Sequence, residues 1–373
     1  MSTDLHRVIV CPLDWGLGHA SRMIPVIRSY IQHGYKVLLG GTGKSGALLK
    51  LTFPDLTFIS IPSYPIRYSS RGIWLIPSLT LQLPLMLLST LREHYRIKKI
   101  VKTYHIQIIV SDNRYGLYCR QAHSIFVTHQ ISPVLPPFLK WAEFPISIIL
   151  RSIICRFDEC WIPDHADAYF NLSGKLSHRF KLPQNARYVG ILSRFERNSH
   201  FSKDNAEEIF SLVAITSGPE PQRSLFSEMI IAQALKLPFR ILVINGLSEN
   251  LPDLPEVHSL LKIVPHLEPD EFAEVLMKAD KIICRSGYSS IMDLIAIGRT
   301  ALLVPTPGQT EQQYLAKNLA GKGWFSYVSQ SELSLTNVFN TPLNTLSPIG
   351  LQINHQCNLP IQSPLDHKNS DHD

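Results

Sequence analysis

Short apolar runs and longer amphipathic stretches alternate along the first half of the chain. Val8–Pro12 predicts a strand, and a glycine turn then opens a stretch with apolar side chains at helical spacing up to Gly34. Glycine is a natural end for that helix because it tolerates the left-handed conformation. Further strands are predicted at Lys36–Gly40, Thr57–Ile61, Ile106–Val110 and Ile125–Thr128. Strands separated by helices indicate a parallel sheet with helices on both faces.

The same alternation restarts after residue 205. Strands are predicted at Leu212–Thr216, Arg240–Ile244, Lys262–Val264, Lys281–Cys284 and Thr300–Pro305. Helices are predicted at Gln222–Leu235, Asp270–Ala279, Ser289–Ile297 and Glu311–Gly321, with Asp270 and Thr310 as N-caps. We therefore expect an α/β protein with two domains, residues 1–192 and residues 193–346. Residues 347–373 are rich in Asn, Pro, His and Asp and predict a loose tail.

Composition supports a globular chain and adds a charge asymmetry. The 373 residues are 45% hydrophobic and 18% charged, which excludes disordered and fibrous classes. Residues 1–192 carry 22 Lys and Arg against 10 Asp and Glu, whereas residues 193–373 carry 14 against 20. The formal charges of +12 and −6 suggest different partners for the two halves, or simple drift between two surfaces.

Cysteine usage and the N-terminus favour a cytoplasmic protein. The six cysteines include no CxxC pair, and Val8–Val10 is too short for the apolar core of a signal peptide. Ile73–Leu91 has 19 residues without a charge, but Pro77 and Pro84 favour an apolar surface or core helix over a transmembrane one. The basic residues that follow suit an anionic membrane face; the alternative is a buried helix followed by a solvated one.

Two glycine-rich turns invite a nucleotide-binding interpretation. Gly16–Ser21 follows a strand and opens a helix, but it lacks the third glycine and the ribose acid of a dinucleotide site. Its free N–H groups still suit an anion. Gly40–Ser45 resembles the end of a P-loop, yet Leu38 stands where the first glycine is needed. A solvated loop is the expected structure there.

Chemically competent residues follow several strands, at the edge where doubly wound folds bind ligands. His19 lies in the first glycine turn and is a candidate base. Ser111–Gly116 and Thr128–Gln130 follow two strands of the same half and are candidate acceptor contacts. In the second half, Ser217–Arg223 suits a diphosphate and Asp293 suits a ribose. No motif of a known nucleic-acid reader is found, and no Asp-x-Asp metal site is apparent at these strand ends.

Taken together, these motifs resemble the GT-B glycosyltransferases, and within them the MurG-type N-acetylglucosaminyltransferases of family 28, in an uncharacterised branch from Bacteroidetes-like bacteria. The matching stretches are Asp14–Arg22, Ser111–Gly116, Val189–Arg194, Ser217–Arg223, Arg285–Asp293 and Pro305–Gln313. Asp293 stands where the family commonly has Glu, and Pro219 and Pro221 lie in a loop that the family makes rich in glycine.

The resemblance implies two Rossmann-like domains facing a central cleft, with the acceptor on the first and the nucleotide sugar on the second. His19 and Asp112 would be rivals for the catalytic role. The implied nucleotide-sugar contacts are Arg194, Gly218, Gln222, Arg223, Arg285, Ser286, Gly287, Asp293, Glu311, Gln312 and Gln313. The implied acceptor-side residues are Gly16, Gly18, Asn113, Arg114 and His129.

The function that the resemblance implies is transfer of an N-acetylhexosamine from a UDP-sugar to a lipid-linked or cell-envelope glycan, with inversion and without an obligatory metal or cofactor. The alternatives are a UDP-sugar epimerase of the same fold and a non-catalytic subunit that binds nucleotide sugars. We also expect a peripheral association of the basic half with an anionic membrane on its cytoplasmic face, and no nucleic-acid partner.

Overall fold

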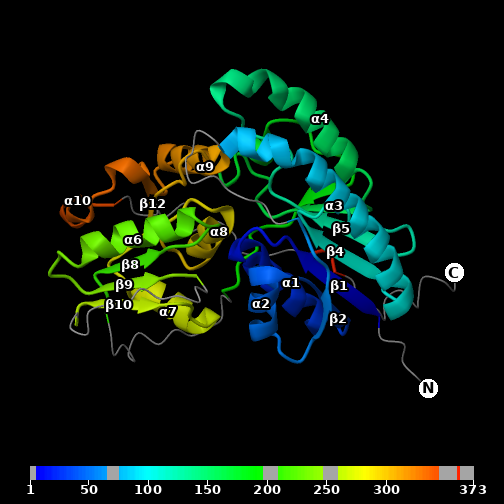
Figure 1. The fold of residues 1–373 in the computed structure, drawn as a ribbon, viewed down its shortest axis with the longest axis horizontal. Helices are drawn as coiled ribbons and strands as arrows, with labels where there is room; N and C mark the ends of the chain where they lie inside the picture. Colours follow the sequence, from blue (N-terminus) through cyan, green and yellow to red (C-terminus); the bar gives the residue numbers. More distant parts are fainter. Residues whose placement is uncertain (1–5, 65–74, 196–208, 247–258, 344–358, 362–373) are drawn as a thin grey trace. The chain divides into compact units, whose positions relative to one another are not determined.

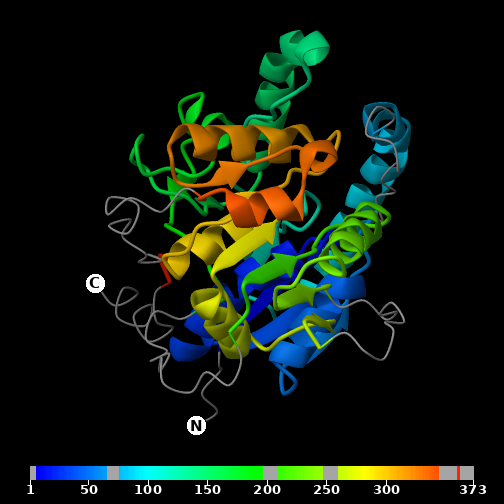
Figure 2. The same ribbon diagram turned by 90° about the vertical axis from the view of Figure 1, so that its left-hand side faces the viewer.

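The computed structural model describes residues 6–64, 75–195, 209–246, 259–343 and 359–361. Of the described residues, 6–64, 80–192 and 359–361 belong to one compact unit, and 75–79, 193–195, 209–246 and 259–343 belong to the other. Each unit has its own parallel sheet with helices on both faces (Figures 1 and 2). The predicted α/β class with two doubly wound sheets is confirmed. Most of the tail predicted at 347–373 lies outside the described residues.

In the described part of the first unit, seven parallel strands lie in the order β3-β2-β1-β4-β5-β6-β7. The strands are β1 (Arg7–Pro12), β2 (Lys36–Gly41), β3 (Thr57–Ser60), β4 (Ile108–Asp112), β5 (His123–Val127), β6 (Glu159–Ile162) and β7 (Ala186–Tyr188). The helices are α1 (Leu17–Gln32), α2 (Gly43–Thr52), α3 (Leu75–Tyr104), the 3-10 helix η2 (Pro137–Ala142), α4 (Glu143–Ile154) and α5 (Lys175–His178). The order reverses between β1 and β4, which is where ligands bind in such sheets.

Central strands of this sheet are covered on both faces. Ile9 and Cys11 of β1 pack with Ile97 and Val101 of α3, while Val10 is also fully buried. A strand without a solvated face has no reason to alternate apolar and polar residues. This is why Val8–Pro12 could be recognised as a continuous apolar run.

Gly40–Ser45 contains the beginning of a helix, where we expected a solvated loop. Helix α2 begins at Gly43. The Asp14 carboxylate lies at its N-terminus and accepts a hydrogen bond from the Ser45 backbone N–H at 3.1 Å. Burial raises the pKa of Asp14, although Ser45 and Thr42 partly offset that effect. A carboxylate already occupies the position of an anion at this helix end, which argues against a phosphate loop.

In the second unit, the described residues form a sheet of six parallel strands in the order β10-β9-β8-β11-β12-β13. The strands are β8 (Leu212–Ile215), β9 (Ile241–Ile244), β10 (Leu261–Val264), β11 (Lys281–Cys284), β12 (Leu302–Leu303) and β13 (Ser326–Tyr327). The helices are α6 (Gln222–Ala234), α7 (Pro269–Lys278), α8 (Tyr288–Ala296), α9 (Thr310–Gly321), the 3-10 helix η3 (Gln330–Glu332) and α10 (Leu335–Asn340). The order reverses between β8 and β11.

The core of the second unit explains the apolar side of α6. Phe226 and Ile230 of this helix pack with Ala214 and Val243 of the sheet, and Val338 of α10 joins the same cluster. The strand expected at Thr300–Pro305 is reduced to Leu302–Leu303. Two predicted caps were wrong by one or two residues: Glu268 is the N-cap of α7, and Gln309 is the N-cap of α9.

The long apolar segment and the basic residues after it form a single helix, α3, which continues through Pro84. Among its described side chains, the leucines near the middle are about half exposed or more, while Ile97, Ile100 and Val101 are buried. The segment is therefore a surface helix in this region, one of the two structures that we predicted. Within the described residues, no helix has the length and apolar character needed to cross a membrane.

Candidate active site

A buried group of ionisable side chains lies at the point where the first sheet reverses its strand order. His19 is in the first turn of α1, directly after the loop that leaves β1, and Asp112 is the last residue of β4. Because β1 and β4 pair in parallel, with Pro12 opposite Asp112, their carboxyl ends bring the two residues together. The His19 Nδ1 lies 2.9 Å from the Asp112 Oδ2. The two predicted catalytic rivals are therefore partners in contact.

Arg22 completes this group, although the sequence motifs had suggested no role for it. Its Nε donates to the Asp112 Oδ1 at 3.0 Å, and its Nη2 lies 2.8 Å from the His19 Nδ1. Its Nη1 lies 3.3 Å from the Nδ1 of His129, which follows β5. The signal available was spacing, because residues three apart on a helix lie on the same face.

Burial and charge set the protonation of this group. Asp112 is fully buried and Arg22 is 2% exposed, whereas 19% of the His19 side chain remains accessible. Burial and then the Arg22 charge lower the pKa of His19, and Asp112 offsets only part of this. Burial alone would raise the pKa of Asp112, but Arg22 and His19 outweigh it and the pKa is lowered. His19 is thus neutral and Asp112 ionised near neutral pH.

The predicted acceptor-side residues Gly16, Gly18, Asn113 and His129 lie in or near this group. Gly16 precedes α1, and its carbonyl accepts from the His19 N–H at 3.3 Å. Gly18 accepts from the Ser21 hydroxyl, and Asn113 donates its N–H to Val127 of β5. These residues shape the turn around His19. His129 is 4% exposed and lies against Arg22, so it belongs to the buried group.

Arg114, predicted as an acceptor contact, has partners within the protein. Its side chain is buried and forms an ion pair with Glu93 of α3 at 2.8 Å. The same Nη2 donates to the carbonyl of Ile61 at 2.9 Å. Arg114 therefore joins α3 to the end of β3. A motif next to a strand cannot reveal this, because Glu93 is 21 residues away in the sequence.

The reversal point of the second sheet gathers helix N-termini. Helices α6, α8 and α9 follow the parallel strands β8, β11 and β12, so all three begin at the carboxyl edge. Contacts hold these beginnings together: the Ser286 hydroxyl donates to the Gln312 carbonyl at 2.8 Å. Neither α6 nor α8 has an acid in its first turn. Such an edge attracts an anion through backbone N–H groups and aligned dipoles.

Arg285 connects the segments at this edge through buried hydrogen bonds. It is 1% exposed, and its guanidinium donates to the carbonyls of Gln222 and Val304, both at 3.2 Å. The guanidinium also stacks 3.9 Å from the centroid of the Phe226 ring. Burial lowers the pKa of Arg285 to about 9. Arg285 therefore stabilises the segments at this edge, and its contact with the nucleotide sugar stays a prediction.

Arg223 also forms hydrogen bonds within the protein. Its Nε donates to Glu220 at 2.9 Å, and its Nη1 donates to the Asn245 carbonyl at 2.7 Å. Its direct contact with a diphosphate stays a prediction. Gly218 lies in the preceding loop with a φ of 123°, and a Cβ there would meet no atom within 4 Å. Here glycine is required by the backbone conformation and not by crowding.

Asp293 lies on α8 and is paired with the segment that begins the second unit. Its Oδ1 accepts from the Ser193 hydroxyl at 2.8 Å, and its Oδ2 accepts from the Arg194 Nε at 2.9 Å. Both predicted residues, Asp293 and Arg194, are thus brought together. A ribose at this position would share a carboxylate that Arg194 already orients.

The remaining predicted residues surround the start of α9. Gln312 accepts from the Thr306 N–H through its amide oxygen at 2.9 Å, which stabilises the loop before the helix. Gln313 is exposed, Glu311 is half-buried, and Gly287 is the N-cap of α8. Among the residues that the structure describes, no group of three or more His, Cys, Asp or Glu could hold a metal ion.

The chain is similar to a known protein family and to individual known proteins. Residues 228–359 match the glycosyltransferase family 28 C-terminal domain. The UDP-N-acetylglucosamine--N-acetylmuramyl-(pentapeptide) pyrophosphoryl-undecaprenol N-acetylglucosamine transferase of Pasteurella multocida is 32% identical over 148 residues, 37% of this chain and 41% of that enzyme. The match thus spans about two fifths of that relative. An uncharacterized glycosyltransferase of Methanosarcina acetivorans is 23% identical over 87% of this chain and 86% of that protein.

Solved structures agree on the fold. The glycotransferase of kitacinnamycin superposes with a TM-score of 0.61 at 11% identity, covering 90% of this chain and 89% of its own. MurG of Acinetobacter baumannii superposes with a TM-score of 0.50 at 14% identity, covering 90% of both chains. The chain has the two-domain α/β fold of the GT-B type, and the predicted resemblance to MurG-type proteins is confirmed.

Proposed function

We propose that this chain is a glycosyltransferase that moves an N-acetylhexosamine from a UDP-sugar to a hydroxyl of a lipid-linked or cell-envelope glycan. The observation that carries the proposal is the gathering of three helix N-termini at the reversal point of the second sheet, joined by Arg285. That edge offers backbone donors to a dianionic diphosphate within an otherwise acidic half. The name of the Pasteurella relative supports N-acetylglucosamine as the sugar.

The first unit supplies a base for the same reaction. A neutral His19 whose Nδ1–H donates to Asp112 has a lone pair on Nε2 that can take the proton of an acceptor hydroxyl. The hydroxyl oxygen then bonds to the anomeric carbon, while the bond from that carbon to the diphosphate breaks. UDP leaves with the electron pair. A single displacement of this kind inverts the configuration at the anomeric carbon.

The second unit stabilises the leaving group. Charge gathers on the diphosphate as the bond breaks, and fixed backbone dipoles need no reorganisation to meet it. Asp293 would accept hydrogen bonds from the ribose hydroxyls while Arg194 orients its carboxylate. We propose that these groups perform the role that a metal ion plays in other transferases, so that no metal is required.

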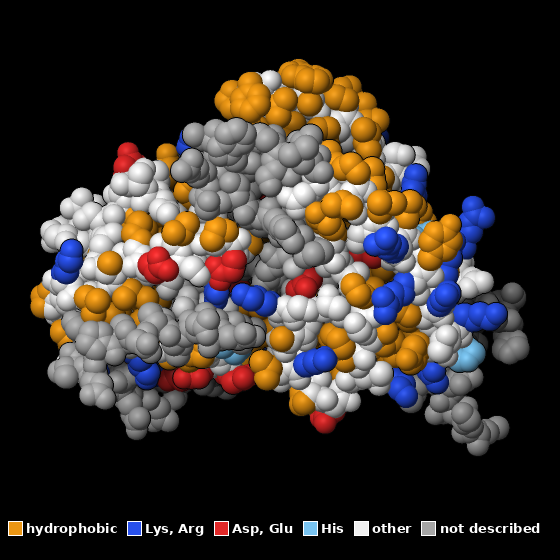
Figure 3. Space-filling model, viewed as in Figure 1, with side chains coloured by type: hydrophobic (Ala, Val, Ile, Leu, Met, Phe, Trp, Pro, Cys, Tyr) orange, Lys and Arg blue, Asp and Glu red, His pale blue; other side chains and the backbone are white. Residues whose placement is uncertain are grey.

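Membrane association is part of the proposal and rests on the surface of the first unit. Leu87 of α3 is 66% exposed, and Trp141 of η2 is 75% exposed. Further large apolar side chains are exposed at Leu83, Leu85, Leu88, Leu91, Phe138, Phe144, Ile148 and Ile149. Figure 3 shows one apolar group over α4 and another along α3, beside Lys and Arg side chains. Exposed patches of this kind mark interaction sites.

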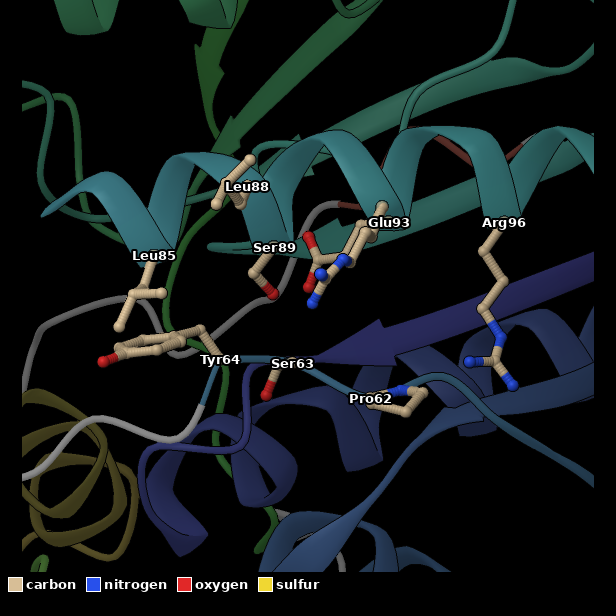
Figure 4. Close-up of a pocket in the computed structure, with 9 residues that line it drawn as sticks. Pro62, Ser63, Tyr64, Leu85, Leu88, Ser89, Glu93 and Arg96 are labelled. Atoms are coloured by element: carbon tan, nitrogen blue, oxygen red, sulfur yellow. The ribbon is translucent and has the colours of Figure 1, made fainter. Parts of the chain in front are cut away.

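A pocket next to this surface combines apolar and cationic walls. It has a volume of about 380 Å³ and lies between α3 and the segment Pro62–Tyr64. Figure 4 shows Tyr64 and Leu85 facing each other at one end and Arg96 reaching toward the other. Arg92 also lines it. Because Arg114 neutralises the Glu93 in its wall, the pocket is cationic overall. We propose that it faces anionic lipid head groups on the cytoplasmic face of the membrane.

Measuring UDP release tests the function. Purified protein is incubated with UDP-N-acetylglucosamine and with a panel of other nucleotide sugars, each with and without lipid extract. The proposal expects UDP release that depends on the lipid. Interconversion of the sugar without an acceptor would replace the transferase by the epimerase alternative. Tight binding without turnover across the panel would instead favour the non-catalytic subunit.

A further inference from the structure

Two polar groups compete for one nitrogen of His19. The Nδ1 lies 2.9 Å from the Asp112 Oδ2 and 2.8 Å from the Arg22 Nη2. A neutral imidazole nitrogen either donates or accepts, whereas a guanidinium only donates. If Nδ1 donates to Asp112, Nε2 is free to accept a proton. If Nδ1 accepts from Arg22, Nε2 carries the hydrogen and the ring cannot act as a base there.

The carboxylate geometry favours the first arrangement. Arg22 directs both Nε and Nη2 to the same oxygen, Asp112 Oδ1, with Nε at 3.0 Å. The other oxygen, Oδ2, is left opposite the His19 Nδ1. Asp112 is fully buried, so an unfilled lone pair would be costly, and a donated Nδ1–H fills it.

The charges around His19 favour its neutral form. The groups that face His19 are Arg22 on its own helix, Asp112 at the end of β4 and His129 after β5. Arg22 and Asp112 cancel, so a proton on His19 would leave one net positive charge in a buried group. His129 adds no negative charge to offset it.

We propose that Arg22 is the positioning residue of this site: it occupies one oxygen of Asp112, leaves the other to orient His19, and keeps His19 unprotonated with its fixed charge. The inference rests on the proposed transferase reaction, in which His19 is the base. Arg22 itself touches no substrate in this scheme. Its effect is to make a base available below the pH at which an ordinary histidine would lose its proton.

The experiment compares three variants. Arg22→Gln removes the charge and the paired donors, and Arg22→Lys keeps the charge. Arg28→Gln removes the same charge from a position nine residues after His19 on α1, about 13 Å from it by helical rise. The titration of His19 is followed by NMR, and the acid limb of kcat for UDP release is followed in parallel. Circular dichroism confirms that each variant is folded.

The expected results are specific. In Arg22→Gln, both the His19 titration and the acid limb move up by about one pH unit, because a nearby cation shifts a histidine by that order. In Arg22→Lys and Arg28→Gln, the His19 titration and the acid limb keep their positions. The value of kcat falls in Arg22→Lys but not in Arg28→Gln, because lysine cannot direct two fixed donors to one carboxylate oxygen. A purely structural role would lower activity equally at all pH values.

Two outcomes overturn the proposal. One is an unchanged His19 titration in Arg22→Gln. The other needs no variant: nitrogen chemical shifts of the unmodified protein that place the hydrogen on Nε2 would show that Nδ1 accepts from Arg22. This second measurement also decides the matter if Arg22→Gln does not fold. If the unmodified protein releases no UDP, the proposed function fails, but the NMR titration still tests Arg22.

Discussion

The two units share one topology but use their reversal points in opposite ways. In the first unit, the point between β1 and β4 holds His19, Arg22 and Asp112, charged or titratable groups in direct contact. In the second unit, the point between β8 and β11 presents helix N-termini, and the cations Arg223 and Arg285 are tied to the protein's own carbonyls. In the proposed reaction, the first edge takes up a proton and the second binds negative charge with backbone dipoles.

The difference shows that a charged residue near a site is not automatically a ligand contact. Arg285 directly follows a strand in the sequence and was predicted to contact the ligand. It is almost fully buried, and it donates to the carbonyls of Gln222 and Val304. His19 keeps an accessible edge although its partners are buried. Accessibility separates residues that meet a substrate from residues that hold the site together.

The sharpest test of the comparison is removal of the base. His19→Gln is expected to lower kcat about 10²–10⁴-fold, the usual contribution of general base catalysis, and to leave UDP affinity unchanged. Stopped assays of UDP release and calorimetric titration with UDP measure the two quantities. Equal loss in both would contradict the division of roles between the units.

Removal of the carboxylate that is predicted to bind the ribose should weaken UDP binding. Asp293→Asn is expected to weaken UDP binding about 10–100-fold, since a hydrogen bond to a charged group contributes about 1.5–3 kcal/mol. The measurement is calorimetric titration with UDP. Asp270→Asn is the control, because Asp270 is an exposed acid in the first turn of α7. Unchanged affinity in Asp293→Asn, with a normal melting temperature, would reject the ribose assignment.

Membrane binding should depend on the first unit alone. Replacing both Arg92 and Arg96 by Gln is expected to weaken binding to anionic vesicles about 30-fold, from about 1 kcal/mol for each basic residue near the surface. Cosedimentation with vesicles of phosphatidylglycerol measures this. Replacing Lys262 by Gln in the second unit is the control. Equal binding of the double variant to those vesicles would refute the proposed docking face.

The smallest expected effect is that of salt on UDP affinity. Raising the salt concentration from 0.1 to 1 M shortens the screening length from about 10 to about 3 Å, which weakens attraction between exposed charges. Vesicle binding should therefore fall strongly, whereas UDP affinity should change less than about threefold, because close backbone donors hold the diphosphate. A parallel loss of both would mean that the overall field of the protein, and not local dipoles, binds UDP.

Local pattern was sufficient for most of the fold. The strands that pair in both sheet centres were predicted because they are buried on both faces and read as apolar runs. Strand β6 was missed although it is largely buried. The short edge strands β7 and β13 were also missed, since they have few residues and partly exposed side chains. Helix α2 was missed because its glycine-rich start is typical of a loop.

Local pattern was less informative about the site. It found His19 and Asp112 but treated them as rivals, because their contact depends on which strands are neighbours in the sheet. It predicted an acceptor contact for Arg114 but not the ion pair of Arg114 with Glu93. The pairing of Asp293 with Arg194, 99 residues apart, was likewise invisible to any local motif.

The sequence by itself determined the two α/β halves, the chemistry available at the end of each strand and the unequal charge of the halves. Only the tertiary structure decided which of those side chains face a ligand and which face one another. The physical reason is that periodicity and turn chemistry act within a few residues, whereas the pairing of buried charges depends on strand order and helix packing. Arg22 illustrates both: its face on α1 follows from spacing, and its role follows from the strand that β1 has as its neighbour.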